Sequence, residues 1–173
     1  MELYRKAKLT ATALLMALVL VLSACTQAPL RLHIMANSDS SEDQQIKLTV
    51  RDAVLELTHE ELMLCENKAQ ARAYIEENLE TIQETANTAL LESGFDYSAD
   101  ANVGVFHFPE KTYQDVTYPQ GDYEALRITL GEGEGQNWWC VMFPPLCITE
   151  MEATDEEVEY TSLFAEFFQS LRK

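Results

Sequence analysis

The uncharged segment from Leu9 to Leu22 constrains this chain most strongly, because it decides which residues are available to fold. It follows a basic head at residues 5–8 and has the length of a secretory core, too short to span a bilayer comfortably. This pattern is typical of an export signal. We therefore expect residues 1–24 to be a signal peptide and residues 25–173 to form a single extracytoplasmic domain.

The end of this leader, Leu22-Ser23-Ala24-Cys25, has the form of a bacterial lipobox. In a lipobox an aliphatic residue and two small ones precede a cysteine that is diacylated and becomes the mature N-terminus. We predict lipidation of Cys25 and attachment to the outer face of the cell membrane. Two alternatives stay open, namely cleavage by ordinary signal peptidase with Cys25 as an incidental thiol, or retention of the leader as an anchor.

The chain is strongly acidic. It has 12 Lys and Arg residues against 29 Asp and Glu, for a formal net charge of −17. The leader is more basic than acidic, so the part that follows it is more acidic still. Such a charge repels phosphate backbones and anionic lipids, which argues against nucleic-acid binding and against a polybasic membrane patch.

Hydrophobic periodicity predicts one strand followed by two helices. Residues 30–36 alternate, which places Leu30, Leu32, Ile34 and Ala36 on one face of a strand and His33 on the other. Apolar residues at helical spacing predict helices at about 41–65 and 68–93. Ser41 with Gln44 forms a capping-box pattern at the first helix, and Gly94 suits a left-handed cap after the second.

Beyond Gly94 the residues become β-branched and aromatic. They predict an antiparallel meander with strands at Val103–Phe108, Lys111–Tyr118 and Tyr123–Leu130. A second capping-box pattern, Thr154 with Glu157, predicts a terminal helix. The fold class is therefore α+β, with a mainly antiparallel sheet against which two N-terminal helices and a C-terminal helix pack.

The run Gly131-Glu132-Gly133-Glu134-Gly135 resembles a phosphate loop only superficially, since two glutamates stand where phosphate would bind. A calcium loop would need further oxygen ligands at alternate positions, and no matching set follows. We instead predict a glycine-rich hairpin connection in which positive φ angles are easy and the glutamates point to water.

Cys140 and Cys147 flank Phe143-Pro144-Pro145, a segment that favours a chain reversal between the two sulfurs. We predict a structural disulfide between them, with Cys65 left over. The alternative is a catalytic Cys140 paired with His33, His59 or His107, although no local signature supports it. The spacing of the histidines matches no zinc-ligand pattern.

Two long segments resemble the stage II sporulation protein R family. They are RLHIMANSDSSEDQQIKLTVRDAVL and YPQGDYEALRITLGEGEGQNWWCVMFPPLC, and the aromatic terminal segment adds to the resemblance. The resemblance implies a protein exported from the forespore into the space between two membranes. There it would activate a membrane-embedded aspartic protease of the mother cell, which processes a sigma-factor precursor.

The resemblance implies no catalytic residue, cofactor or metal. It points only to candidates for a receptor-binding surface, and for each of them a role in folding is the alternative. The predicted lipobox departs from the simplest picture of the family, a freely secreted signal. The candidate partner-binding residues are Arg31, His33, Asn37, Asp39, Tyr123, Glu124, Arg127, Trp138 and Trp139.

Two functional hypotheses follow from the sequence. The first is a non-enzymatic signalling ligand, supported by the export signal and the family-like segments. The second is a cell-envelope hydrolase acting on peptidoglycan, with either Cys140 and a histidine or a pair of carboxylates as its catalytic groups.

Overall fold

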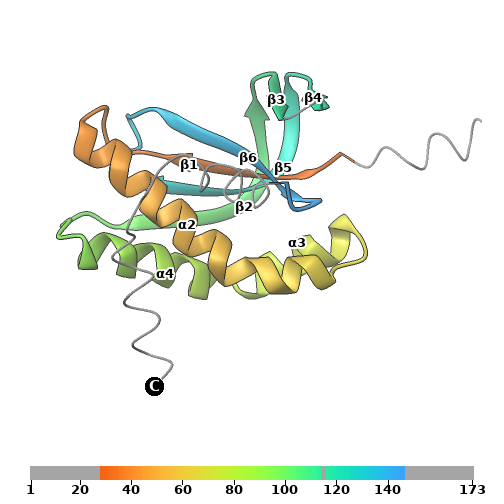
Figure 1. The fold of residues 1–173 in the computed structure, drawn as a ribbon, viewed down its shortest axis with the longest axis horizontal. Coiled ribbons are helices and arrows are strands. Elements are labelled where there is room, and N and C mark those ends of the chain that lie inside the picture. The colour runs from red at the N-terminus through yellow and green to blue at the C-terminus, as the bar shows by residue number, and fades with distance from the viewer. Residues whose placement is uncertain (1–27, 114–115, 147–173) are drawn as a thin grey trace, which may run out of the picture.

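The computed structural model describes residues 28–113 and 116–146, which form a sheet with helices packed against one of its faces (Figure 1). The α+β fold class predicted from the sequence is confirmed. The elements in chain order are β1 (Leu30–Met35), α2 (Ser41–Leu64), α3 (Lys68–Glu77), α4 (Leu79–Glu92), β2 (Ala99–Phe108), β3 (Lys111–Tyr113), β4 (Val116–Tyr118), β5 (Gly121–Leu130) and β6 (Asn137–Phe143).

Strand β1 lies inside the main sheet, whose strand order is β2-β5-β1-β6. It pairs with β5 in parallel and with β6 antiparallel, so both of its edges are hydrogen-bonded. Leu30, Leu32 and Ile34 are fully buried in the core that the sheet shares with the helices. The alternation predicted for this segment is therefore confirmed, with His33 on the opposite face.

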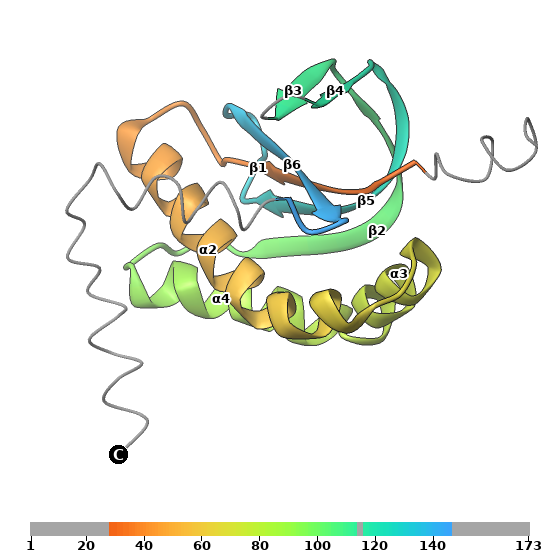
Figure 2. The same ribbon diagram turned by 45° about the vertical axis from the view of Figure 1, so that its right-hand side comes forward.

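The simple meander is wrong in two places. Residues 111–118 do not form one strand, because β3 and β4 pair only with each other and lie on the side of the sheet away from the helices (Figures 1 and 2). Pro109 and Pro119, at the two ends of this excursion, cannot donate to a sheet ladder. In addition β5 and β6 are not neighbours, because the apolar strand β1 separates them.

The first helix begins where the sequence predicted, but with a different cap. Ser40 is the N-cap, and its side-chain oxygen accepts a hydrogen bond from the Asp43 amide at 3.1 Å. Ser41 is already helical, and its hydroxyl donates to the Glu42 carboxylate. A cap needs the extended backbone that Ser40 has, so the predicted pairing of Ser41 with Gln44 is one residue late.

The predicted helix at 68–93 is two helices joined at Asn78. The backbone amide and the side-chain amide of Asn78 both donate to the Tyr74 carbonyl, which ends α3. The left-handed cap predicted after α4 is confirmed, since Gly94 has φ +83°. Its amide and that of Phe95 reach back to the carbonyls of Leu91 and Leu90, the pattern of a Schellman motif.

Three predictions fall outside the described residues: the signal peptide with Cys25, the partner cysteine Cys147, and the helix expected from Thr154 onward. Among the residues that are described, no helix combines the length and apolar character that crossing a membrane requires.

Replacing Ser40 by alanine removes the acceptor for the Asp43 amide. The free energy of unfolding should fall by about 1 kcal/mol, measured by chemical denaturation of the purified protein. Ser41→Ala is the matched control and should change it by less than about 0.5 kcal/mol. Equal losses in the two variants would contradict the assignment of Ser40 as the cap.

Candidate functional site

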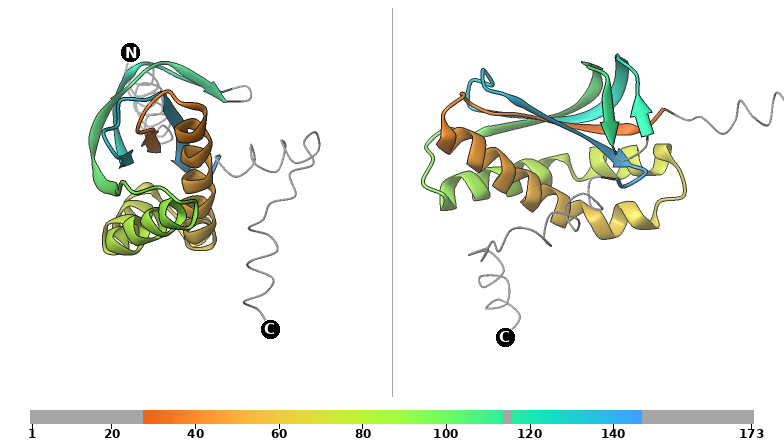
Figure 3. Two further views of the ribbon diagram at one scale, coloured as in Figure 1. Left: turned by 90° about the vertical axis from the view of Figure 1, so that its left-hand side faces the viewer. Right: turned by 45° about the horizontal axis from the view of Figure 1, so that its top comes forward.

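One face of the main sheet carries none of the described helices, which all pack against the other face (Figure 3). Side chains alternate along a strand, and the pairing register brings alternate residues of four strands together on this side. We call it the helix-free face. Its predicted partner-binding residues are Arg31, His33, Tyr123, Arg127 and Trp139, and it also carries Phe106, Phe108 and Asn137.

Arg31 is fully buried on this face, under the β3–β4 hairpin. Its Nε donates to the Cys140 carbonyl and its Nη2 to the Tyr113 hydroxyl, both at 3.1 Å. Four aromatic rings surround the guanidinium, which gives the cation favourable contacts with the ring faces. The distances from Cζ to the ring centroids are 4.5 Å for Phe108, 5.0 Å for Tyr123, 5.4 Å for Tyr118 and 5.6 Å for Tyr113.

His33 stacks on Trp139, with ring centroids 3.8 Å apart and an interplanar angle of 14°. Its Nε2 lies 2.8 Å from the Asn137 Oδ1, so with that oxygen as acceptor the neutral ring leaves Nδ1 unprotonated. Burial lowers the pKa of His33 below its ordinary value of 6.5, and nearby Arg127 lowers it further, although the Asn137 hydrogen bond acts the other way. The ring is therefore neutral at pH 7.

Arg127 lies directly opposite His33 in the parallel β1–β5 register. Its guanidinium sits over the Phe106 ring, 4.2 Å from the centroid. Arg51 and Arg72 each form an ion pair with a carboxylate, but within residues 28–113 and 116–146 Arg127 has no such pair. The contact with the Phe106 ring is thus its stabilising partner among the described side chains.

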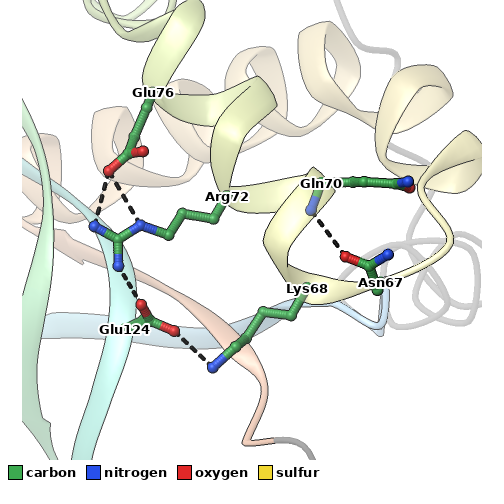
Figure 4. A network of polar contacts seen from close by, with 6 residues as sticks. All are labelled: Asn67, Lys68, Gln70, Arg72, Glu76 and Glu124. Atoms are coloured by element: carbon green, nitrogen blue, oxygen red, sulfur yellow. Dashed lines mark hydrogen bonds and ion pairs between the residues drawn. The ribbon is translucent and has the colours of Figure 1, made fainter.

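Two of the predicted partner-binding residues, Glu124 and Trp138, point to the helices instead. Glu124 binds Lys68 at 2.6 Å and also pairs with Arg72, which ties β5 to α3 (Figure 4). The hydrogen bond from Lys68, joined by that from Arg72, lowers the pKa of this carboxyl. Trp138 packs against the core, with the Arg51 guanidinium 5.2 Å above its ring.

Asn37 and Asp39 hold the glycine-rich loop against the end of β1. The Asn37 Oδ1 accepts from the Glu132 amide at 3.0 Å, and the Asp39 Oδ1 accepts from the Gln136 amide at 2.8 Å. The loop is thus a crossover past β1, and the predicted hairpin connection is wrong because β5 and β6 flank that strand. A Cβ at Gly135 would clash with the Ser38 carbonyl, so only glycine lets the two segments approach this closely.

Other predictions for this loop are confirmed. Gly131 and Gly133 have φ angles of +55° and +67°, and the side chains of Glu132 and Glu134 are exposed. The backbone amides of residues 131–136 all donate to acceptors of the protein, which leaves none of them for a phosphate.

Asp43 organises the neighbouring helix start, and its role was not predicted. Its carboxylate accepts hydrogen bonds from the Ser38 hydroxyl at 2.5 Å, the Tyr97 hydroxyl at 2.6 Å and the Asn37 amide at 2.9 Å. Burial opposes ionisation, yet these donors lower the pKa of Asp43 and hold it charged. The only sequence signal was an acidic residue in a first helical turn, which is too common to single out.

The cysteine–histidine pair proposed for hydrolysis is not assembled around His33. Cys140 is fully buried and faces the helices, whereas His33 lies on the helix-free face. His107 is exposed and contacts Asp122 and Gln120. No cluster of three or more His, Cys, Asp or Glu side chains suited to a metal occurs among the described residues. The Cys140–Cys147 disulfide stays a prediction.

The pKa of His33 predicts how stability depends on pH. Because that pKa lies below 6.5, the stability that depends on a neutral His33 is fully present above pH 6.5. This stability is lost as the pH falls through the lowered pKa. In His33→Gln this loss should disappear, so the free energy of unfolding should fall less steeply than in the wild type between about pH 7.5 and 5. The difference between the two slopes should be at most about 1.4 kcal/mol per pH unit. His107→Gln, at an exposed site, should keep the wild-type slope. Equal slopes for wild type and His33→Gln would refute this assignment.

The chain matches known proteins across most of the described fold. The profile of the family described as Stage II sporulation protein R matches residues 26–153. Stage II sporulation protein R of Bacillus subtilis (strain 168) is 40% identical over 131 residues, covering 74% of this chain and 58% of the relative. The chain thus spans less than two thirds of the relative's length. No solved structure matches it. On the family match, this chain belongs to the stage II sporulation protein R family of sporulation proteins.

Proposed function

We propose that the chain is an exported sporulation signal that activates a membrane-embedded aspartic protease of the mother cell, which then processes a sigma-factor precursor. The observation that carries this proposal is membership of the stage II sporulation protein R family over residues 26–153. The leader with its uncharged core agrees with export, since the protein would have to act outside the compartment that makes it.

The composition of the helix-free face is consistent with a binding role. Arginine and aromatic residues are the types that most often anchor protein interfaces, because they bury large areas and also make directed polar contacts. Arg127, Phe106 and Trp139 are all half-buried there, so each keeps part of its surface available to a partner. This combination supports a ligand that is recognised by another protein.

Deleting the gene should leave the sigma-factor precursor unprocessed although the protease is present, because the activating signal is missing. An immunoblot of sporulating cells measures the ratio of precursor to mature factor. A wild-type copy should restore processing, whereas a copy lacking residues 1–24 should not, because it stays in the compartment that makes it. Normal processing in the deletion strain would refute the proposed function.

We also propose that Cys25 is diacylated and tethers the protein to the outer face of the forespore membrane. The support is the order Leu22-Ser23-Ala24-Cys25 directly after the uncharged core. A tethered domain could still reach a protein in the opposite membrane across a narrow gap. Two acyl chains would make that anchor firm, at about 0.8 kcal/mol for each buried methylene.

Growth with labelled palmitate tests the anchor. The wild-type protein should carry the label and sediment with membranes, and Cys25→Ser should lose both properties. Cys65→Ser changes a cysteine within the described fold and should keep the label. A wild-type protein without label would overturn lipidation and leave the signalling proposal untouched.

A further inference from the structure

Within the described residues, the helix-free face carries two arginines that form no ion pair with a carboxylate. Four arginines lie in the described residues, and two of them, Arg51 and Arg72, bind carboxylates. No ion pair joins Arg31 or Arg127 to a carboxylate within that part of the chain. In a protein with a net charge of −17, carboxylates are abundant, so two unpaired arginines on one face require an explanation.

The same face holds every buried side-chain nitrogen or oxygen that lacks a hydrogen-bond partner within the described residues. These atoms are Arg31 Nη1, His33 Nδ1 and Arg127 Nε. Buried polar atoms are usually paired, and each unpaired one costs about 1–3 kcal/mol. His33 and Arg127 are direct neighbours in the β1–β5 register, and Arg31 lies two residues from His33 on β1. The two arginine nitrogens are donors, and they point to an acceptor that the described residues do not supply, whereas the unprotonated His33 Nδ1 is itself an acceptor.

Arg127 is the residue of this group that a ligand can reach. Arg31 is enclosed by four rings, and His33 is only 6% exposed, whereas Arg127 is half-buried. Asp100, on the same side by register, accepts a hydrogen bond from Asn102 and forms no ion pair with Arg127 within the described residues. The guanidinium fork is therefore available, with Arg31 adding positive charge nearby.

We infer that the helix-free face binds a carboxylate on an acidic segment of the partner protein, through the Arg127 guanidinium beside His33 and Trp139. A guanidinium fork matches the two oxygens of a carboxylate and can donate two parallel hydrogen bonds to them. The Phe106 and Trp139 rings supply apolar surface for the residues on either side of it. The identity of the partner rests on the proposed function, but the carboxylate site does not.

The surrounding charge favours a single carboxylate over a phosphate-rich surface. The acidic chain as a whole repels polyanions and anionic membranes at long range. A partner segment that brings one or two carboxylates among apolar residues meets Arg127, with Arg31 adding positive charge nearby, and carries less negative charge for the acidic chain to repel. Electrostatic complementarity of this kind gives specificity for one partner.

The site can be tested without the partner by using a matched pair of small probes. The full mature protein is titrated with 3-phenylpropionate or with 3-phenylpropionamide, which has the same shape and no charge. The His33 and Trp139 side-chain signals in NMR spectra should shift saturably with the carboxylate, with an affinity about ten-fold higher than for the amide. No saturable shift, or equal shifts with the two probes, would overturn the inference.

A wild-type protein that fails to respond because its own chain or a second copy covers the face also counts against the inference. Displacement of the probe by lower concentrations of inorganic phosphate or phosphatidylglycerol vesicles would show that the site takes an anion of another source, and would likewise overturn it.

Variants then locate the site. Arg127→Gln should weaken carboxylate binding about ten-fold, and Arg127→Lys should have an intermediate effect because it keeps the charge and loses the fork. Arg51→Gln is the matched control, since Arg51 also lies over an aromatic ring but packs on the helix side, and it should bind within about two-fold of wild type. Unchanged binding in Arg127→Gln would overturn the assignment.

In cells, a copy with Arg127→Glu should fail to restore sigma-factor processing to the deletion strain at normal protein level, and Arg51→Gln should restore it. Full rescue by Arg127→Glu would overturn the partner-docking inference while the signalling proposal stands. Failure of the wild-type copy to rescue would count against the proposed function instead, and the probe titration would still decide the carboxylate site.

Discussion

Strand β1 is hydrogen-bonded along both edges and buried on both faces, and the other described elements are arranged around it. Its leucines and isoleucine provide the apolar surface against which the helices pack, while Arg31 and His33 lie at the centre of the opposite face. Because β5 and β6 occupy its two edges, the chain between them must cross its end. That requirement explains why Gly135 packs so closely against Ser38.

The buried Arg31 organises the aromatic side chains of the helix-free face around its guanidinium. Burying an ionised group is costly, and here no carboxylate in the described residues offsets it. The cost is met by two hydrogen bonds and by the faces of four aromatic rings. Because Tyr113 also donates to the Trp139 carbonyl at 2.8 Å, the same contacts join the β3–β4 hairpin to β6. The cation thus links fold stability to the shape of the proposed docking face.

Much of the fold was predictable because local patterns and tertiary packing agree. The alternation in β1, the long apolar stripe of α2 and the glycine cap at Gly94 each point to the element that forms. The periodicity did not predict the break at Asn78, because Ile75 and Ile82 stay at helical spacing on either side of it. Both are buried, but they belong to separate helices. Alternation along a strand could have predicted that Glu124 and Tyr123 lie on opposite faces of the sheet, because they are adjacent residues of β5.

The sequence by itself determined the α+β class, the starts of α2 and α3 to within a residue, the left-handed cap at Gly94 and the two faces of β1. These depend on side-chain periodicity and on short-range hydrogen bonds, which a linear pattern contains. Only the tertiary structure decided that β1 separates β5 from β6, that the side of β5 and β6 with Glu124 and Trp138 is the one that meets the helices, and that Arg31, His33 and Arg127 share a face. The place of β1 in the sheet depends on pairing between residues about one hundred positions apart, and no local pattern encodes it.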